Sequence, residues 1–227
     1  EVNVGMHRCG VEPGQPALDL AQIVDQAPHL TFAGLMGYEG HLVFVPSLEE
    51  RVQRVRNDLQ ALIDTVEFVE SNGLPVKIVS SGGTGTAMIT STLPRITEIQ
   101  AGSYVFMDGR YQTVEGLEFV CALSMLTTVV SRPAPDRIII DAGMKTITHE
   151  FGLPRFKNRD DLELLGLSEE HGTARLADPS VQLQPGDKLE LIPSHGDTTL
   201  NIHDAYYCLR HGQVEAIWSI SGRGRSQ

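Results

Sequence analysis

Cysteine and positive charge are both scarce in this sequence of 227 residues. The three cysteines, Cys9, Cys121 and Cys208, are odd in number and widely spaced, which argues against a disulfide framework and favours a reducing compartment, the cytoplasm. Lysine and arginine total 18 against 29 aspartate and glutamate residues, a formal net charge of −11. Because phosphates attract basic patches, we expect neither a nucleic-acid partner nor a membrane-surface partner.

Long apolar runs are also absent from the sequence. No run approaches the roughly 20 residues that a bilayer span requires, and we find no internal repeat and no low-complexity tract. Apolar residues make up 41% and charged residues 21% of the chain, values that are ordinary for a globular protein. The length is enough to bury a core in one large domain or in two modest ones.

The first half of the chain alternates strand-like runs with helical patterns. Apolar residues at helical spacing predict helices over residues 14–27 and 47–73, the second with a capping box and an Asn-Gly stop signal. The predicted strands cover residues 1–4, 31–38, 76–79 and 102–108. Strands and helices in this succession predict parallel β/α units.

The second half is rich in strands and lacks a long predicted helix. Its β-rich runs, residues 121–133, 137–143, 187–195 and 213–221, have turn residues between them and predict a mostly antiparallel β domain. We therefore divide the chain into residues 1–117 and 118–227. Four β/α units are too few for a (β/α)₈ barrel, which takes about 250 residues, and the chain starts inside a predicted strand. We expect a missing N-terminal portion.

The strongest local signal is the glycine-rich loop "SSGGTGT", residues 80–86, directly after a predicted strand. Glycines let several backbone N–H groups converge on one point, a nest suited to phosphate, and the hydroxyls of Ser81, Thr84 and Thr86 add further donors. The loop lacks the lysine of a P-loop and the spacing of a dinucleotide-binding loop. By pattern alone, a phosphate site and a flexible surface loop both remain open.

Polar side chains follow three other predicted strands. Arg8 follows the first, Tyr38 and His41 the second, and Asp108 and Tyr111 the fourth. Such strand ends are where sites are built in β/α barrels. Each residue alone is more typical of packing or of a surface salt bridge, so the case rests on their occurring together.

His195 and Asp197, in "PSHGDTT", form the one pair with metal-ligand chemistry. At i and i+2 they would project from the same side of an extended segment. Imidazole and carboxylate suit Mn²⁺, Mg²⁺ or Zn²⁺, but two ligands are an incomplete set without water or substrate. By spacing alone a polar turn is favoured over a metal site. His203 and Asp204 either support the ligands from behind or begin the next element.

Several motifs occur together in an order that resembles a known family. They are "GMHRCGVEPG", "FAGLMGYEGH", "SSGGTGT", "GSYVFMD", "IIIDAGMK" and "PSHGDTTLNIHDAYY". In this order they resemble the D-threonine aldolase and D-serine dehydratase-like family of pyridoxal 5'-phosphate (PLP) enzymes, which is related to alanine racemase. The resemblance implies an α/β fold, the C-terminal half of an alanine-racemase-like (β/α)₈ barrel, followed by a mostly antiparallel β domain.

The resemblance also implies roles for the residues in the matching motifs. Arg8 looks like the arginine that approaches the phenolic oxygen of PLP, and Tyr38 like the tyrosine that lines the cofactor pocket. The cofactor phosphate would be held by the loop residues Ser81, Gly82, Gly83, Thr84, Gly85 and Thr86. Residues 1–117 are then a partial PLP-binding barrel.

His195 and Asp197 match the metal pair of the family, which places the predicted metal site in residues 118–227. Dehydratases of the family typically have Cys at the second position and use Zn²⁺, whereas aldolases have Asp and use Mn²⁺ or a similar ion. Asp197 therefore favours the aldolase branch, with Mn²⁺ or Mg²⁺ ahead of Zn²⁺. "HGDTT" departs from the "HCDPT" of the aldolases.

The resemblance implies a PLP- and metal-dependent lyase that cleaves the Cα–Cβ bond of a D-β-hydroxy amino acid to give glycine plus an aldehyde. The alternatives are a metal-dependent D-serine or 3-hydroxy-D-aspartate dehydratase and, from another class, a non-catalytic PLP-binding protein. The family's Schiff-base lysine lies on the first barrel strand, and none of the four lysines here sits in a matching motif, so we expect it upstream of Glu1 in a longer enzyme. Relatives are commonly homodimers.

Overall fold

The computed structural model describes residues 1–225, which group into two compact units. Unit 1 comprises Glu1–Tyr104 and Thr113–Glu118; unit 2 comprises Val105–Gln112 and the chain from Phe119 onward. The predicted boundary after residue 117 falls one residue before the end of the second segment of unit 1. Among residues 1–225, no helix has the length and apolar character needed to cross a membrane.

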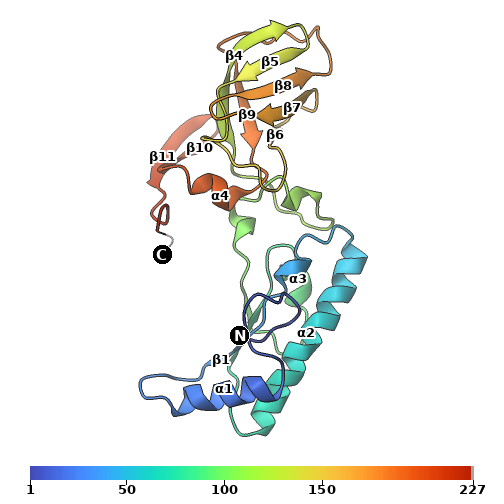
Figure 1. Ribbon diagram of the computed structural model, residues 1–227, viewed down its shortest axis with the longest axis vertical. Helices are drawn as coiled ribbons and strands as arrows, with labels where there is room; N and C mark the ends of the chain where they lie inside the picture. Colours follow the sequence, from blue (N-terminus) through green and yellow to red (C-terminus); the bar gives the residue numbers. More distant parts are fainter. Residues whose placement is uncertain (226–227) are drawn as a thin grey trace. The chain divides into compact units, whose positions relative to one another are not determined.

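Unit 1 is a small α/β unit built around a parallel sheet (Figure 1). The strand order is β1-β2-β3, and both pairings are parallel. The strands are β1 (Gly34–Met36), β2 (Ile78–Ser81) and β3 (Glu98–Ile99), the helices are α1 (Gln15–Gln26), α2 (Leu48–Ser71) and α3 (Ala87–Thr90), and a short 3₁₀ turn covers Gly40–Leu42. Two further 3₁₀ turns, Ser103–Val105 and Tyr111–Thr113, span the points at which the chain passes from one unit to the other. The predicted parallel β/α organisation is confirmed.

The long helix α2 forms where the sequence signals predicted it (Figure 1). The Ser47 hydroxyl accepts a hydrogen bond from the backbone N–H of Glu50 at 3.4 Å, which caps the N-terminus. At the other end Gly73 has a φ of +90°, a left-handed conformation that glycine adopts without strain. A stripe of fully buried side chains, among them Val55 and Leu59, faces the core of unit 1. Burial of each such side chain stabilises the fold by roughly 1.5–3 kcal/mol.

Two predicted strands of unit 1 are wrong. Residues 1–4 form no strand: Val2 makes an isolated bridge with Val11 and donates its N–H to the Met36 oxygen at 2.7 Å, and the chain turns at Gly5, which has a φ of +111°. Residues 102–108 contain a 3₁₀ turn, since the backbone N–H of Tyr104 donates to the Thr84 hydroxyl at 3.0 Å instead of to a neighbouring strand. The place beside β2 is taken by β3, which the sequence pattern did not predict.

Unit 2 is dominated by a six-stranded sheet in the order β6-β9-β4-β5-β8-β7, with every pairing antiparallel. Its strands are β4 (Met125–Ala134), β5 (Arg137–Ile140), β6 (Arg155–Phe156), β7 (Leu162–Leu167), β8 (Gly172–Leu176) and β9 (Lys188–Ile192). A hairpin of β10 (Ala205–Arg210) and β11 (Gln213–Ser219) follows the short helix α4 (Gly196–Leu200). The predicted antiparallel β region is confirmed.

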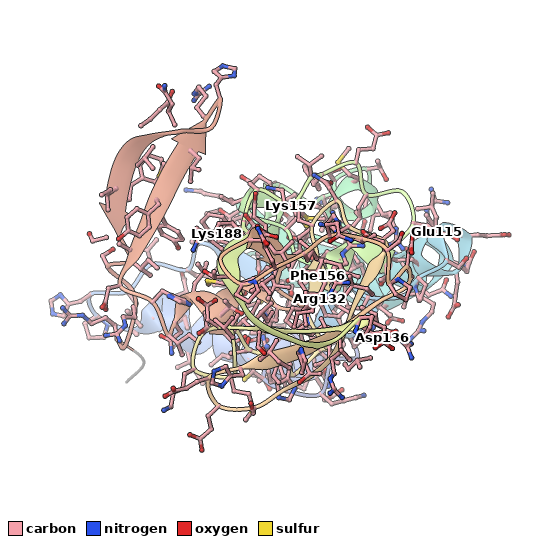
Figure 2. All side chains as sticks on the ribbon, turned by 90° about the horizontal axis from the view of Figure 1, so that it is seen from above. Glu115, Arg132, Asp136, Phe156, Lys157 and Lys188 are labelled. Atoms are coloured by element: carbon pink, nitrogen blue, oxygen red, sulfur yellow. The ribbon has the colours of Figure 1, made fainter. Side chains whose placement is uncertain are left out.

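The core of unit 2 lies between its strands and the connection before β9. Val129, Ile138, Ile140 and Leu191 are fully buried at its centre. Arg132, labelled in Figure 2, fixes the connection that precedes β9. Its guanidinium donates to several backbone oxygens there: those of Pro179 at 2.9 Å, Val181 at 2.8 Å and Leu183 at 3.0 Å. This network holds the chain that leads into β9 and α4.

Candidate cofactor and metal sites

The glycine-rich loop after β2 has no space for side chains at two of its glycines. A Cβ on Gly85 would lie 1.9 Å from the carbonyl oxygen of Val43, and a Cβ on Gly83 would lie 2.9 Å from the Tyr38 hydroxyl. Gly82 has a φ of +85°, which turns the chain sharply out of β2. The loop is therefore packed within unit 1 and is not a flexible surface loop.

Glu39 is a fully buried carboxylate beneath this loop. Its Oε2 accepts hydrogen bonds from the Ser81 hydroxyl at 2.8 Å and from the backbone N–H of Gly82 at 3.1 Å. Its Oε1 accepts from the Thr90 hydroxyl at 2.6 Å. Charge-assisted hydrogen bonds of this kind tie the loop to α3 and to the segment after β1. Sequence reasoning missed Glu39; the available signal was an acidic residue inside "GYEGH", next to Tyr38.

Replacing Glu39 with Leu should lower the stability of the protein by several kcal/mol, because three buried donors lose their acceptor and each unsatisfied group costs about 1–3 kcal/mol. E39Q keeps an acceptor oxygen and should cost less. The measurement is the urea unfolding midpoint of unit 1, with E98Q as the control, since Glu98 accepts only from the Ser80 hydroxyl at the edge of the loop. An E39L protein as stable as the E98Q protein would contradict the role of Glu39.

The loop hydroxyls bond mainly within the protein. Ser81 donates to Glu39, the Thr86 hydroxyl accepts from the backbone N–H of Gly83 at 3.0 Å, and the Thr84 hydroxyl accepts from that of Tyr104. Within residues 1–225, by contrast, the backbone N–H groups of Thr84 and Gly85 donate to no protein acceptor although both residues are buried. Buried N–H groups require a partner, and an anion such as a phosphate would supply one. The loop therefore fits a phosphate group through its backbone.

Arg8 and Tyr38 lie together beside this loop in unit 1. The Arg8 guanidinium carbon is 5.6 Å from the centre of the Tyr38 ring, a cation–π contact. Burial and the nearby Glu39 carboxylate raise the pKa of Tyr38, while Arg8 opposes that effect, so the phenol stays protonated at neutral pH. Residues from three separate segments, Arg8, Tyr38 and Gly83, are thus brought to one place. His41 lies elsewhere, paired with Asp58 at 2.8 Å.

His195 and Asp197 lie at the start of α4 in unit 2. The predicted extended segment is wrong, because the helix begins at Gly196 and His195 is its N-cap residue. The helix starts there because the Asp108 carboxylate accepts the backbone N–H of Gly196 at 3.3 Å. Even so, His195 Nε2 and Asp197 Oδ2 are 3.6 Å apart, so the two side chains lie close enough to bind one ion.

Asp108 is a buried carboxylate whose second oxygen, Oδ1, accepts the backbone N–H of Tyr111 at 2.9 Å. Burial raises its pKa, and the N–H groups of Tyr111 and Gly196 act in the opposite direction. The predicted strand end at Asp108 is instead a turn, and the side chain serves to hold the start of α4. The buried hydroxyl of Ser194, the residue before His195, has no hydrogen-bond partner in the described chain.

Glu150 contacts the Nδ1 edge of the His195 ring. Its Oε1 is 2.6 Å from His195 Nδ1 and also accepts a hydrogen bond from the Thr198 hydroxyl. Partial burial raises the pKa of Glu150, but the hydrogen bonds from Thr198, its own backbone and His195 outweigh that effect and lower the pKa to about 2. Sequence reasoning missed Glu150, because 45 residues separate it from His195 and no spacing connects them.

His203 and Asp204 do not support the metal pair. His203 Nε2 is 2.7 Å from the backbone oxygen of Thr146, and Asp204 pairs with Arg223 at 3.1 Å. No group of three or more His, Cys, Asp or Glu side chains suited to a metal occurs in the part of the chain that the structure describes. His195 and Asp197 therefore offer two ligands of types that suit Mn²⁺, Mg²⁺ or Zn²⁺, and the remaining positions are open to water or substrate.

The lysines of unit 2 bond to neighbouring side chains (Figure 2 labels Lys157 and Lys188). Lys157 pairs with Glu190 at 2.7 Å, Lys188 donates to the Thr128 hydroxyl at 2.6 Å, and Lys145 pairs with Glu170 at 2.9 Å. These are contacts of structural lysines, so none of the three is marked out for cofactor chemistry. The position of the Schiff-base lysine stays a prediction.

A parallel β/α unit with a glycine-rich loop, followed by an antiparallel β unit, defines the alanine-racemase-like class. Residues 1–109 match the family model described as "Alanine racemase, N-terminal domain", and residues 122–209 match "Putative serine dehydratase domain". The chain is thus similar, over both segments, to alanine-racemase-like enzymes, among them D-threonine aldolases and serine dehydratases.

Three relatives show how far the similarity extends. The chain is 39% identical to a D-threonine aldolase of an Arthrobacter species, over 100% of this chain and 61% of the relative. It is 36% identical to a 3-hydroxy-D-aspartate aldolase of Paracoccus denitrificans, over 99% of this chain and 60% of the relative. The crystal structure of D-threonine aldolase from Filomicrobium marinum superposes with a TM-score of 0.95 at 34% identity, over 98% of this chain and 61% of the relative. The chain thus spans about three fifths of the length of these relatives.

Proposed function

We propose that the whole protein is a PLP- and divalent-metal-dependent lyase that cleaves the Cα–Cβ bond of a D-β-hydroxy amino acid, giving glycine and an aldehyde. The observation that carries this proposal is the His195 and Asp197 pair at the start of α4, with Nε2 and Oδ2 3.6 Å apart. Aspartate at the second position is typical of the aldolases. The names of the two relatives, both aldolases of D-β-hydroxy amino acids, support the same branch.

Unit 1 would hold the cofactor. The unpaired backbone N–H groups of Thr84 and Gly85 would bind its phosphate, with the rest of the Ser81–Thr86 loop shaped around them. Arg8 and Tyr38 would line the part of the pocket that holds the cofactor ring, and Glu39 holds the loop through its hydrogen bonds. PLP bound there would supply an electron sink for the electron pair that the broken Cα–Cβ bond leaves on Cα.

Unit 2 would hold the metal through His195 Nε2 and the Asp197 carboxylate. Asp197 is exposed, so it reaches an ion without giving up another bond. A cation bound there would supply Lewis acidity that lowers the pKa of the substrate's β-hydroxyl, whose proton must leave for the bond to break. Because the carboxylate is a hard oxygen ligand, Mn²⁺ or Mg²⁺ is favoured, and Zn²⁺ remains an alternative.

The competing function is a dehydratase acting on D-serine or 3-hydroxy-D-aspartate, which the "Putative serine dehydratase domain" match to residues 122–209 favours. The products separate the two. With D-threonine, PLP and Mn²⁺ we expect glycine and acetaldehyde, whereas a dehydratase would form 2-oxobutyrate and ammonia. With 3-hydroxy-D-aspartate, an aldolase forms glycine and glyoxylate, and a dehydratase forms oxaloacetate and ammonia.

Chromatography of the products from each substrate checks this prediction and ranks the two substrates by initial rate. The enantiomer L-threonine is the matched control, and we expect no product from it. Formation of the oxo acid with ammonia would overturn the aldolase proposal in favour of the dehydratase. No product from any substrate, with PLP bound, would favour the non-catalytic PLP-binding protein.

We further propose a homodimer in the cytoplasm. The homodimer rests on the family resemblance, and the compartment rests on the three cysteines, none of which is in a disulfide in the described chain. Light scattering of the purified protein measures the oligomeric state.

A further inference from the structure

The two ring nitrogens of His195 face different partners. Nδ1 is 2.6 Å from Glu150 Oε1, and Nε2 is 3.6 Å from Asp197 Oδ2. In a neutral imidazole one nitrogen carries the proton and the other has the lone pair. A carboxylate at hydrogen-bond distance from Nδ1 draws the proton to that atom, so the lone pair is left on Nε2.

Glu150 is itself held in place against α4. The Thr198 hydroxyl donates to the same oxygen that faces His195. The Thr148 hydroxyl, two residues before Glu150, is 2.8 Å from that of Thr198 and 2.9 Å from that of Thr199. Segment 148–150 is therefore attached to the first turn of α4 at several points, and the carboxylate keeps a defined position relative to the ring.

The orientation of the His195 ring is restricted by a second contact. The Phe151 ring packs against it with centroids 4.5 Å apart and an angle of 32° between the planes. A hydrogen bond at Nδ1 and an aromatic ring against one face together leave the imidazole little rotational freedom. Pre-orientation of this kind strengthens metal binding, because less side-chain entropy is lost when the ion binds.

Glu150 does not serve as a third ligand in this arrangement. A group bonded to Nδ1 lies on the opposite side of the ring from an ion bound to Nε2. In keeping with this, residues 1–225 contain no group of three metal-donor side chains. The role left for Glu150 is to act through His195.

We propose that Glu150 is a positioning residue that holds His195 in the tautomer with the proton on Nδ1, so that Nε2 is the metal-binding atom. This inference rests on the proposed metal site at His195 and Asp197. The inference goes beyond that site, because it assigns Glu150 as the carboxylate that selects the metal-binding nitrogen. Glu150 is part of neither the metal pair nor the PLP pocket.

The test measures Mn²⁺ binding and the histidine tautomer in the whole protein with PLP bound. E150L removes the acceptor, and we expect a Kd for Mn²⁺ that is about 10–100-fold weaker, the usual effect of removing such a partner. E150Q keeps an acceptor oxygen and should weaken binding by less. E170L is the matched control, because Glu170 is an exposed glutamate of unit 2 that pairs with Lys145 and not with His195; its Kd should equal that of the wild type.

The tautomer is read from the ¹⁵N chemical shifts of His195 in metal-free protein, assigned by the signals missing in H195A. Wild type should show the proton on Nδ1, and E150L a mixture of tautomers. A proton on Nε2 in the wild type would overturn the proposal whatever the variants do. If E150L folds and keeps the wild-type Kd while H195A loses binding, the role of Glu150 is overturned and the metal site is kept. An unchanged Kd in H195A would overturn the metal site and this proposal together.

Discussion

We expect H195A and D197A each to lose most of the aldol cleavage activity while PLP absorbance stays unchanged. The reason is that His195 and Asp197 are the only two ligands assigned to the metal, and a Lewis acid contributes several kcal/mol to the stabilisation of developing charge. At about 1.4 kcal/mol per factor of ten, this corresponds to a fall in kcat of roughly 10²–10⁴-fold. The residues proposed to bind PLP are in unit 1, so the cofactor spectrum should not change.

The measurement is acetaldehyde release from D-threonine at saturating Mn²⁺, followed by a coupled NADH assay. D204A is the matched control, since Asp204 is an exposed aspartate of the same unit that pairs with Arg223 and not with His195; it should keep full activity. Removal of divalent ions with a chelator should reduce the wild type to the level of H195A. Full activity in both H195A and D197A would refute the metal assignment.

G85A should bind PLP roughly 5–150-fold more weakly than the wild type. The new Cβ would lie 1.9 Å from the carbonyl oxygen of Val43, and backbone at this position cannot yield as a flexible side chain would. Overpacking of this kind typically costs about 1–3 kcal/mol, which corresponds to roughly 5–150-fold in a dissociation constant. The distortion falls on the Thr84 and Gly85 N–H groups, the two that would meet the phosphate.

Titration of the metal-free protein with PLP, followed by absorbance, measures the effect. G102A is the matched control: Gly102 is in the same unit, and a Cβ there meets no atom within 4 Å. Thermal unfolding without PLP separates loss of fold from loss of binding, since a variant that melts near the wild type but binds PLP weakly has a damaged site. If G85A binds PLP with wild-type affinity, the glycine-rich loop is not part of the cofactor site.

Periodic elements could be predicted from the sequence, because their signals are local. Helix α2 follows a stripe of apolar residues between a capping serine and a glycine with positive φ. The β-rich runs of the second half are likewise local patterns, and they became β4, β5, β9 and β11. Residues 102–108 were mispredicted because an apolar run is compatible with a strand or with a turn, and the Thr84 hydroxyl favours the turn by binding the Tyr104 N–H.

The residue types of both candidate sites can be read in the chain itself: the glycines of "SSGGTGT" and the His and Asp of "HGD". Their partners depended on tertiary structure. Glu39 reaches Ser81 across 42 residues, and Glu150 reaches His195 across 45. A short sequence pattern can reveal the ligand residues because those residues lie close together in the sequence. The groups that orient those ligands come from distant segments, and only the folded chain brings them within hydrogen-bond distance.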